Sequence, residues 1–84
     1  MTDLEYDILD ELYFVVPFQE VMKELELDEL TLKGALKSML DKGWVKCFLD
    51  ASEEAVQSGI DFESKYRNYY YLASKQGLLK HNGR

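Results

Sequence analysis

The sequence changes from a helical pattern to a strand-like one at a single residue, Gly43. Before it, apolar residues recur at helical spacing from Leu32 to Leu40, and Gly43 suits the left-handed turn that closes a helix. After it, residues 44–49 have the aromatic and β-branched composition of a half-buried strand, and a second aromatic run follows at residues 69–72. The pattern predicts a helix that runs directly into the first of two antiparallel strands.

Capping and spacing signals predict further helices around this unit. A Thr-x-x-Glu capping box begins at Thr2, Pro17 suits the first turn of a helix, and Asp28 can cap the helix that Gly43 closes. The expected helices span about residues 3–14, 17–25, 29–42 and 74–81. The polar connection between the strands, residues 50–64, is expected to be a long loop with one short helical turn, and residues 82–84 are expected to fray.

Length and composition favour one domain over residues 1–84. A chain of 84 residues buries only about 60–65% of its unfolded surface, so nearly every large apolar residue is needed for the core. The sequence has no apolar stretch of about 18 residues and its N-terminus is acidic, so we expect neither a membrane span nor a secretory signal. The single cysteine, Cys47, excludes an internal disulfide and fits a reducing compartment. We therefore expect a cytoplasmic protein.

Three segments resemble the winged helix-turn-helix domain of bacterial transcription regulators. Residues 21–25 (Val-Met-Lys-Glu-Leu) and 36–45 (Leu-Lys-Ser-Met-Leu-Asp-Lys-Gly-Trp-Val) are similar to the second helix, the third helix and the first wing strand of that superfamily. Residues 71–77 (Tyr-Leu-Ala-Ser-Lys-Gln-Gly) resemble the stretch after the wing in its MarR-like and PadR-like branches. The resemblance implies a mostly helical α+β fold with three helices, a two-stranded β-wing and a short C-terminal helix.

The resemblance also implies a DNA-binding surface. In this superfamily the third helix enters the major groove and the wing touches the DNA backbone. The expected DNA contacts are the outward side chains of the third helix and basic residues near the second strand: Lys33, Lys37, Ser38, Lys65 and Arg67. The expected function is that of a small transcriptional regulator, or of an accessory to one, that binds duplex DNA.

The distribution of charge leaves the kind of partner open. Residues 1–30 carry ten acids and one base, whereas residues 31–84 carry nine bases and six acids, so the two parts have net charges of −9 and +3. Acids cluster just before the third helix, where a duplex would approach, and Lys33 and Lys37 each have a carboxylate four residues away for a surface ion pair. The alternative is an acidic winged-helix module that binds a protein and does not bind DNA.

The first helix carries a second candidate surface. Tyr6, Leu9 and Tyr13 fall on a flank beside its main apolar stripe. Regulators of this superfamily commonly dimerise through their first and last helices, so the resemblance implies a homodimer with these three residues in the interface. In the alternative interpretation, the tyrosine rings pack beneath the wing or the last helix and keep their hydroxyls in water.

Gly34 points outward from the third helix and costs about 0.5–1 kcal/mol relative to alanine in a helix interior. Two interpretations follow. Either another backbone, of protein or nucleic acid, approaches closely at this position, or the glycine is tolerated because the core face holds the helix.

The sequence contains no motif for catalysis, a metal or a cofactor. Cys47 lies among hydrophobic residues and the only histidine, His81, is in the segment expected to end the chain loosely, so they do not suit a nucleophile–base pair. No cysteine–histidine cluster suits zinc, and no glycine-rich loop follows a strand. Cross-strand packing accounts for the tyrosine run at residues 69–71. We expect a non-enzymatic protein without a cofactor.

Overall fold

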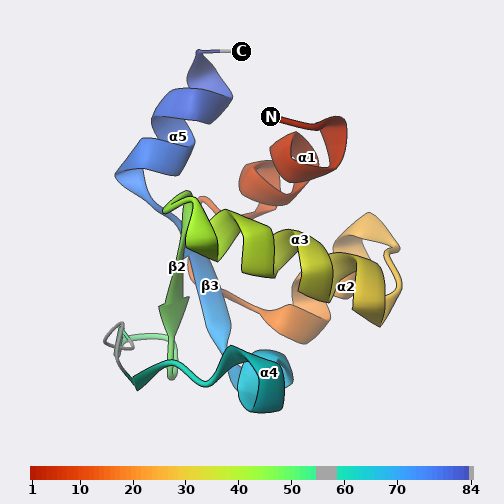
Figure 1. Cartoon of the computed structure of the whole chain (residues 1–84), viewed down its shortest axis with the longest axis vertical. Coiled ribbons are helices and arrows are strands. Elements are labelled where there is room, and N and C mark those ends of the chain that lie inside the picture. The colour runs from red at the N-terminus through yellow and green to blue at the C-terminus, as the bar shows by residue number, and fades with distance from the viewer. Residues whose placement is uncertain (55–58, 84) are drawn as a thin grey trace.

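The computed structural model describes residues 1–54 and 59–83 (Figure 1). Within these residues the chain forms five α-helices, one 3₁₀ helix and three β-strands. In chain order they are α1 (Asp3–Glu11), β1 (Val16–Pro17), α2 (Phe18–Leu25), α3 (Glu29–Asp41), β2 (Val45–Phe48), α4 (Phe62–Lys65), the 3₁₀ helix η2 (Tyr66–Asn68), β3 (Tyr70–Ala73) and α5 (Lys75–Asn82). The expected α+β class is confirmed. None of these helices is both long enough and apolar enough to cross a membrane.

The first helix begins where the sequence predicts and ends earlier. The Thr2 hydroxyl accepts a hydrogen bond from the Glu5 N–H (3.1 Å), and the Glu5 carboxylate accepts one from the Thr2 N–H (2.8 Å), which confirms the capping box. α1 ends at Glu11, three residues before the predicted end. The Leu12 carbonyl accepts a hydrogen bond from the Ala73 N–H of β3 (2.9 Å), so pairing with the sheet replaces the last helical turn.

The junctions around α2 and α3 largely follow local signals. Asp28 caps α3 by accepting a hydrogen bond from a backbone N–H of its first turn (2.7 Å). α3 ends at Asp41, and Gly43 follows with a φ of 77°, in the left-handed region expected of it. Pro17 differs slightly from the prediction, because it is the last residue of β1 and lies just before α2.

The sheet is antiparallel and has the strand order β1-β3-β2 in the part of the chain that the structure describes. β2 and β3 are the strand pair that the sequence predicts, and Cys47 of β2 lies opposite Tyr71 of β3. β1 is a third strand of two residues, Val16 and Pro17, and has no strand pattern of its own. It is aligned by pairing with the central strand, so the predicted two-stranded sheet is corrected to three strands.

A single hydrophobic cluster lies between the sheet and helices α1, α2 and α3. Its members come from all three of these helices, from β2 and β3, and from α4 and η2. The fully buried side chains among them are Ile8, Leu9, Leu12, Phe18, Val21, Leu32, Leu36, Met39 and Tyr71. Because α3 contributes only one side to this cluster, its opposite side is left to solvent, and that side forms part of the site described below.

Hydrogen bonds fix the start of α5 to the junction between α3 and β2. The Ser74 hydroxyl donates to the Gly43 carbonyl (2.6 Å), and the Ser74 N–H donates to the Trp44 carbonyl (2.9 Å). The same hydroxyl accepts a hydrogen bond from the Gly77 N–H (3.0 Å) and so caps α5. A Cβ atom built on Gly77 would lie 2.1 Å from the Trp44 carbonyl oxygen. The glycine is therefore required by the close approach of α5 to this backbone.

His81 does not lie in a frayed tail, which corrects the expectation from sequence. α1 and α5 lie side by side at one end of the molecule (Figure 1), and His81 is 7% exposed between them. Its ring stacks on Tyr6 with 4.1 Å between ring centres, and the Tyr13 hydroxyl lies 3.2 Å from its Nδ1. The carboxylate of Asp10 is 3.6 Å from its Nε2. These contacts with α1 and with Tyr13 just after it hold His81 of α5 in a fixed position.

An ion pair joins α1 to the end of α3. The Lys42 ammonium donates to the Glu5 carboxylate (3.0 Å), whose side chain is 7% exposed, and lies 4.6 Å from the centre of the Trp44 ring. Burial by itself raises the pKa of Glu5, but hydrogen bonds from Thr2 and Lys42 outweigh it and lower this pKa from its usual value of 4.5. Glu5 is therefore more acidic in the folded protein than in the unfolded chain.

We expect the protein to lose stability as the pH falls below 4.5. A group whose pKa is lowered by folding contributes its full stabilisation above the unfolded value, and loses it as the pH falls through the folded value. Urea unfolding from neutral pH down to about pH 3 measures this loss. The Glu5→Gln variant should have a shallower decline than the parent protein; an identical decline would show that Glu5 is not a source of the acid sensitivity.

Candidate functional site

α3 exposes a straight row of residues, here called the outer stripe: Leu30, Gly34, Lys37 and Asp41. They follow one another at intervals of three or four and therefore lie on one side of the helix, opposite its buried side chains. Leu30 is 74% exposed, and a Cβ built on Gly34 meets no atom within 4 Å. Lys37 and Asp41 are exposed and form no ion pair with the residues that the structure describes.

Lys33 is half-buried and turned toward α4. Its Nζ lies 3.5 Å from the Glu63 carboxylate and 4.9 Å from the centre of the Tyr66 ring. The ion pair expected between Lys33 and Glu29, one helical turn apart, is not formed. The ring and the α4 carboxylate hold this ammonium instead, so Lys33 is partly withdrawn from solvent.

Glu29 joins the start of α3 to η2. Its Oε2 accepts hydrogen bonds from Nε (2.9 Å) and Nη2 (2.5 Å) of Arg67, and another from the Tyr66 hydroxyl. The Tyr66 hydroxyl and then the Arg67 guanidinium lower the pKa of Glu29. The carboxylate therefore stays charged at neutral pH and neutralises Arg67. Lys65 and Ser38, the other expected DNA contacts here, are exposed and half-buried, respectively.

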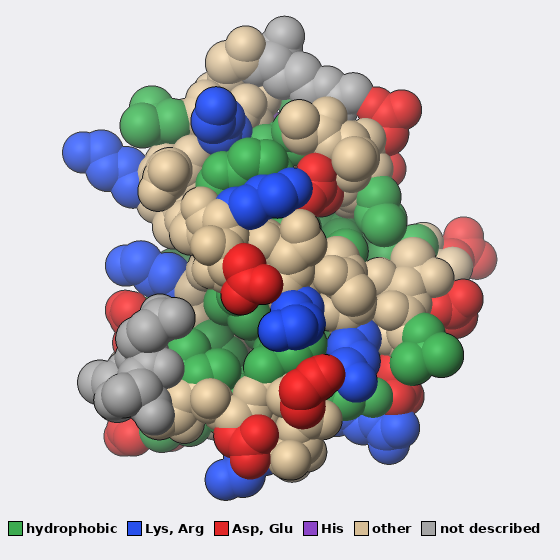
Figure 2. Space-filling model, in the orientation of Figure 1, with side chains coloured by type: hydrophobic (Ala, Val, Ile, Leu, Met, Phe, Trp, Pro, Cys, Tyr) green, Lys and Arg blue, Asp and Glu red, His purple; other side chains and the backbone are tan. Residues whose placement is uncertain are grey.

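Acidic and basic side chains alternate over this side of the molecule (Figure 2). Residues 28–68 hold eight acids and six bases, a net charge of −2. Two of the expected DNA contacts, Lys33 and Arg67, meet around the ring of Tyr66, and each is paired with a carboxylate. The predicted basic residues are therefore present, but they do not gather into a basic patch.

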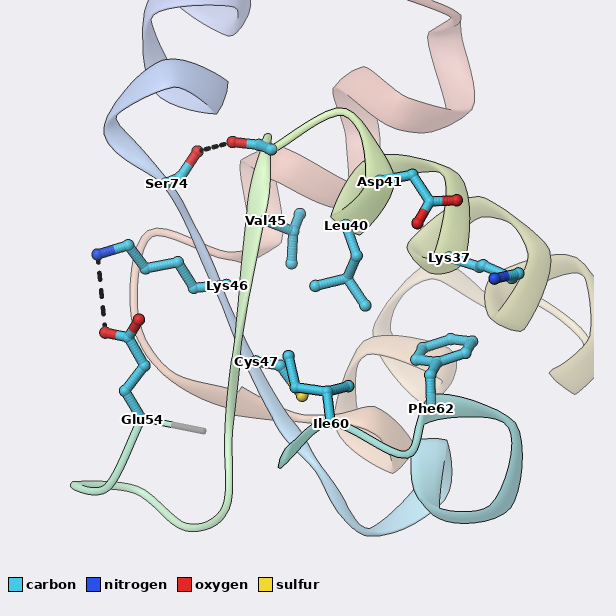
Figure 3. Close-up of a pocket in the computed structure, with 11 residues that line it drawn as sticks. Lys37, Leu40, Asp41, Val45, Lys46, Cys47, Glu54, Ile60, Phe62 and Ser74 are labelled. Atoms are coloured by element: carbon cyan, nitrogen blue, oxygen red, sulfur yellow. Dashed lines mark hydrogen bonds and ion pairs between the residues drawn. The ribbon is translucent and has the colours of Figure 1, made fainter. Parts of the chain in front are cut away.

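A cleft of about 430 Å³ opens between α3, β2 and the chain that leads into α4 (Figure 3). Apolar side chains that point toward one another form its floor: Leu40, Val45, Cys47, Ile60 and Phe62. Charged side chains form its rim: Lys37, Asp41, Lys46 and Glu54. In the space-filling view, hydrophobic side chains remain visible at this position, with acidic and basic groups around them (Figure 2). Binding sites commonly combine apolar side chains with polar groups that fix the orientation of the bound group.

Cys47 lies in the floor of this cleft as an uncharged thiol. Burial raises its pKa to about 12, which leaves almost no thiolate at neutral pH. On the rim, Lys46 and Glu54 pair with each other (3.7 Å). No group of three histidine, cysteine, aspartate or glutamate residues in the described part of the chain is placed to hold a metal ion.

Ile60 and Phe62 are among the site residues that sequence analysis did not assign. They lie in the polar 50–64 segment, which was expected to be a long loop with one short helical turn. The helical turn in the described residues is α4, at the end of that segment. Two apolar residues spaced two apart in a polar run are the only local signal, and nothing local indicates that they face Leu40 across a cleft.

The three residues expected to form an interface on α1 have different surroundings. Leu9 is fully buried in the core, so the prediction that it lies on the surface is wrong. In α1 the Leu9 side chain faces inward together with that of Ile8. Tyr6 stacks on His81, and Tyr13 is 46% exposed with its hydroxyl near the same ring. The tyrosines thus pack on the last helix, and a homodimer through Tyr13 stays a prediction.

Comparisons with known protein families, with curated proteins and with solved structures found no match to this chain.

Proposed function

We propose that the chain is a winged-helix domain that binds a protein partner through the outer stripe of α3 and the adjacent cleft. The order of elements supports this frame, because α1, β1, α2 and α3 are followed by β2 and β3, and the strand order is β1-β3-β2. The long connection between β2 and β3 would be the wing. In this frame α3 is the helix that helix-turn-helix proteins present to their partner.

The pairing of Lys33 with Glu63 and of Arg67 with Glu29 carries the preference for a protein over DNA. DNA binding at physiological salt depends on cations that neutralise phosphates and release counterions. Here two of the five expected cationic or polar contacts are already neutralised within the domain. The formal net charge of −6 on the whole chain would add long-range repulsion of the duplex.

The apolar content of the same face supports a protein partner. Leu30 is 74% exposed at one end of the outer stripe, and Leu40 and Ile60 are half-buried in the cleft at its other end. Protein interfaces commonly combine a small apolar centre with a charged, solvent-accessible rim. A duplex offers few apolar groups to such a centre, whereas leucine, methionine or aromatic side chains would fill it.

DNA binding is the second candidate. Lys37 is the observation that favours it, since this side chain is exposed in the middle of α3 and unpaired among the described residues. In a winged-helix frame it would point into the major groove. Under this candidate the protein would be a small transcriptional regulator, or an accessory to one.

Fluorescence anisotropy of a labelled mixed-sequence duplex separates the two candidates. We expect no salt-sensitive binding to the duplex between about 50 and about 200 mM salt, because the face lacks a basic patch. The double variant Lys33→Glu, Lys37→Glu and the control Lys80→Glu, which makes the same charge change on α5, should then resemble the parent protein. Salt-sensitive binding that falls at least tenfold in the double variant, and persists in the control, would establish the DNA-binding candidate instead.

A further inference from the structure

The cleft beside α3 has the shape and lining to accept a side chain from a second protein. We propose that its occupant is a bulky apolar residue of an amphipathic helix that lies along the outer stripe, with a carboxylate facing Lys37 and a cation facing Asp41. The inference rests on the protein-binding function proposed above and specifies the partner's chemistry. It requires three features to coincide on one face: a pocket, a place of close approach and unpaired charges.

The size and lining of the cleft suit a side chain better than a whole small molecule. Its volume of about 430 Å³ is at the low end of the roughly 300–1,000 Å³ range of ligand pockets, and residues of α3 form one of its walls. The accessible part of its floor comes from Leu40 and Ile60, with the buried Phe62 beside them. None of these side chains offers a hydrogen bond, so a leucine, methionine or phenylalanine side chain matches the floor.

Gly34 marks the place where a partner backbone can approach. It lies on the outer stripe between Leu30 and Lys37, and its missing Cβ leaves open space. Leu30 to Lys37 spans two turns, about 10 Å along the axis, so a helix that packs at Gly34 can contact both of these side chains. A helix that crosses at Gly34 would cover the exposed Leu30 side chain on one side. On the other side it would reach the cleft.

The unpaired charges on the rim define the polar part of the partner. Lys46 and Glu54 neutralise each other, and so do Lys33 and Glu63. Lys37 and Asp41 remain, one helical turn apart and without an ion pair among the described residues. An acid and a base one turn apart on the partner helix would complement both. Like charges at those positions would be repelled, so this pair would contribute specificity.

Selection of peptides on the intact chain tests the inference. A phage-displayed library of random 16-residue peptides is long enough to form a helix across the outer stripe, at about 1.5 Å per residue. We expect enriched peptides to share one bulky apolar residue and an acid and a base spaced three or four apart. Synthetic versions should bind the parent protein and lose at least tenfold in affinity to Ile60→Glu, which places a charge in the cleft.

Substitutions at exposed positions keep the test valid if Ile60→Glu fails to fold. The double variant Lys37→Glu, Asp41→Lys should reverse the preference, so that a peptide with its acid and base exchanged binds it better than the original peptide does. Gly34→Ala should bind the peptide several-fold more weakly, although alanine strengthens the helix itself. Lys80→Glu on α5 is the matched control and should bind like the parent protein.

The outcomes separate failure of the inference from failure of the proposed function. Enriched peptides that bind the charge-reversed and Gly34→Ala variants unchanged would overturn the inference and the proposed position of the site on α3, while the proposal that the chain binds a protein would stand. No enrichment of any peptide, together with salt-sensitive duplex binding, would overturn both. No enrichment and no duplex binding would also overturn the inference, since the cleft would then accept no apolar anchor.

Discussion

Replacing Gly77 with alanine is expected to lower the free energy of unfolding by about 3 kcal/mol or more, which is a large share of the total for a domain of this size. The added Cβ would lie 2.1 Å from the carbonyl oxygen of Trp44 and 2.9 Å from its carbonyl carbon. Both are backbone atoms, so no rotamer change relieves the overlap. The hydrogen bonds of Ser74 to Gly43 and Trp44 hold α5 in this position. Either these bonds lengthen or the backbone before β2 shifts.

Urea unfolding of the Gly77→Ala variant measures the effect, and Gly34→Ala is its matched control. Gly34 is also a helical glycine, but a Cβ there meets nothing within 4 Å. Alanine at Gly34 should therefore raise the free energy of unfolding by about 0.5–1 kcal/mol. If Gly77→Ala unfolded at the same urea concentration as the parent protein, the close packing of α5 against the Trp44 backbone would be wrong.

The elements that sequence analysis predicted correctly depend on neighbours in the chain. The capping box at Thr2, the cap at Asp28 and the left-handed turn at Gly43 each involve residues no more than four apart, and local pattern is enough to locate them. β1 depends on a distant partner. Its two residues become a strand only because they pair with β3, more than fifty residues later, and two residues cannot display a period.

The candidate site was predicted only in part, because some of its features depend on residues that are distant in the sequence. Lys37 depends only on the geometry of α3, and its outward position could be read from helical spacing. The partners of Lys33 and Arg67 depend on where α4 and η2 come to lie. Sequence spacing indicated a local pair between Glu29 and Lys33, whereas in the fold Arg67 and Tyr66 occupy that carboxylate. The electrostatic character of the face is therefore a tertiary property.

Tyr71 is expected to be the side chain on which the core and the site both depend. It is fully buried on the central strand, and its hydroxyl donates to the Tyr66 carbonyl of η2 (2.8 Å). Removal of the ring in Tyr71→Ala should cost about 3–5 kcal/mol, as for other large buried aromatic residues, and is expected to leave little folded protein at 37 °C. Removal of the hydroxyl alone in Tyr71→Phe should cost about 1–2 kcal/mol, because a buried carbonyl loses its donor.

The loss of stability in Tyr71→Phe is expected to be largest in η2. The Tyr66 carbonyl is the acceptor that loses its bond, while the Tyr66 ring and hydroxyl face Lys33, Arg67 and Glu29. Amide hydrogen exchange should therefore accelerate more at residues 66–68 than in α3. The matched control is Tyr70→Phe on the same strand, whose hydroxyl has no hydrogen-bond partner among the described residues. Equal acceleration across the whole chain would mean that the Tyr71 hydroxyl stabilises the core alone and does not position the proposed binding face.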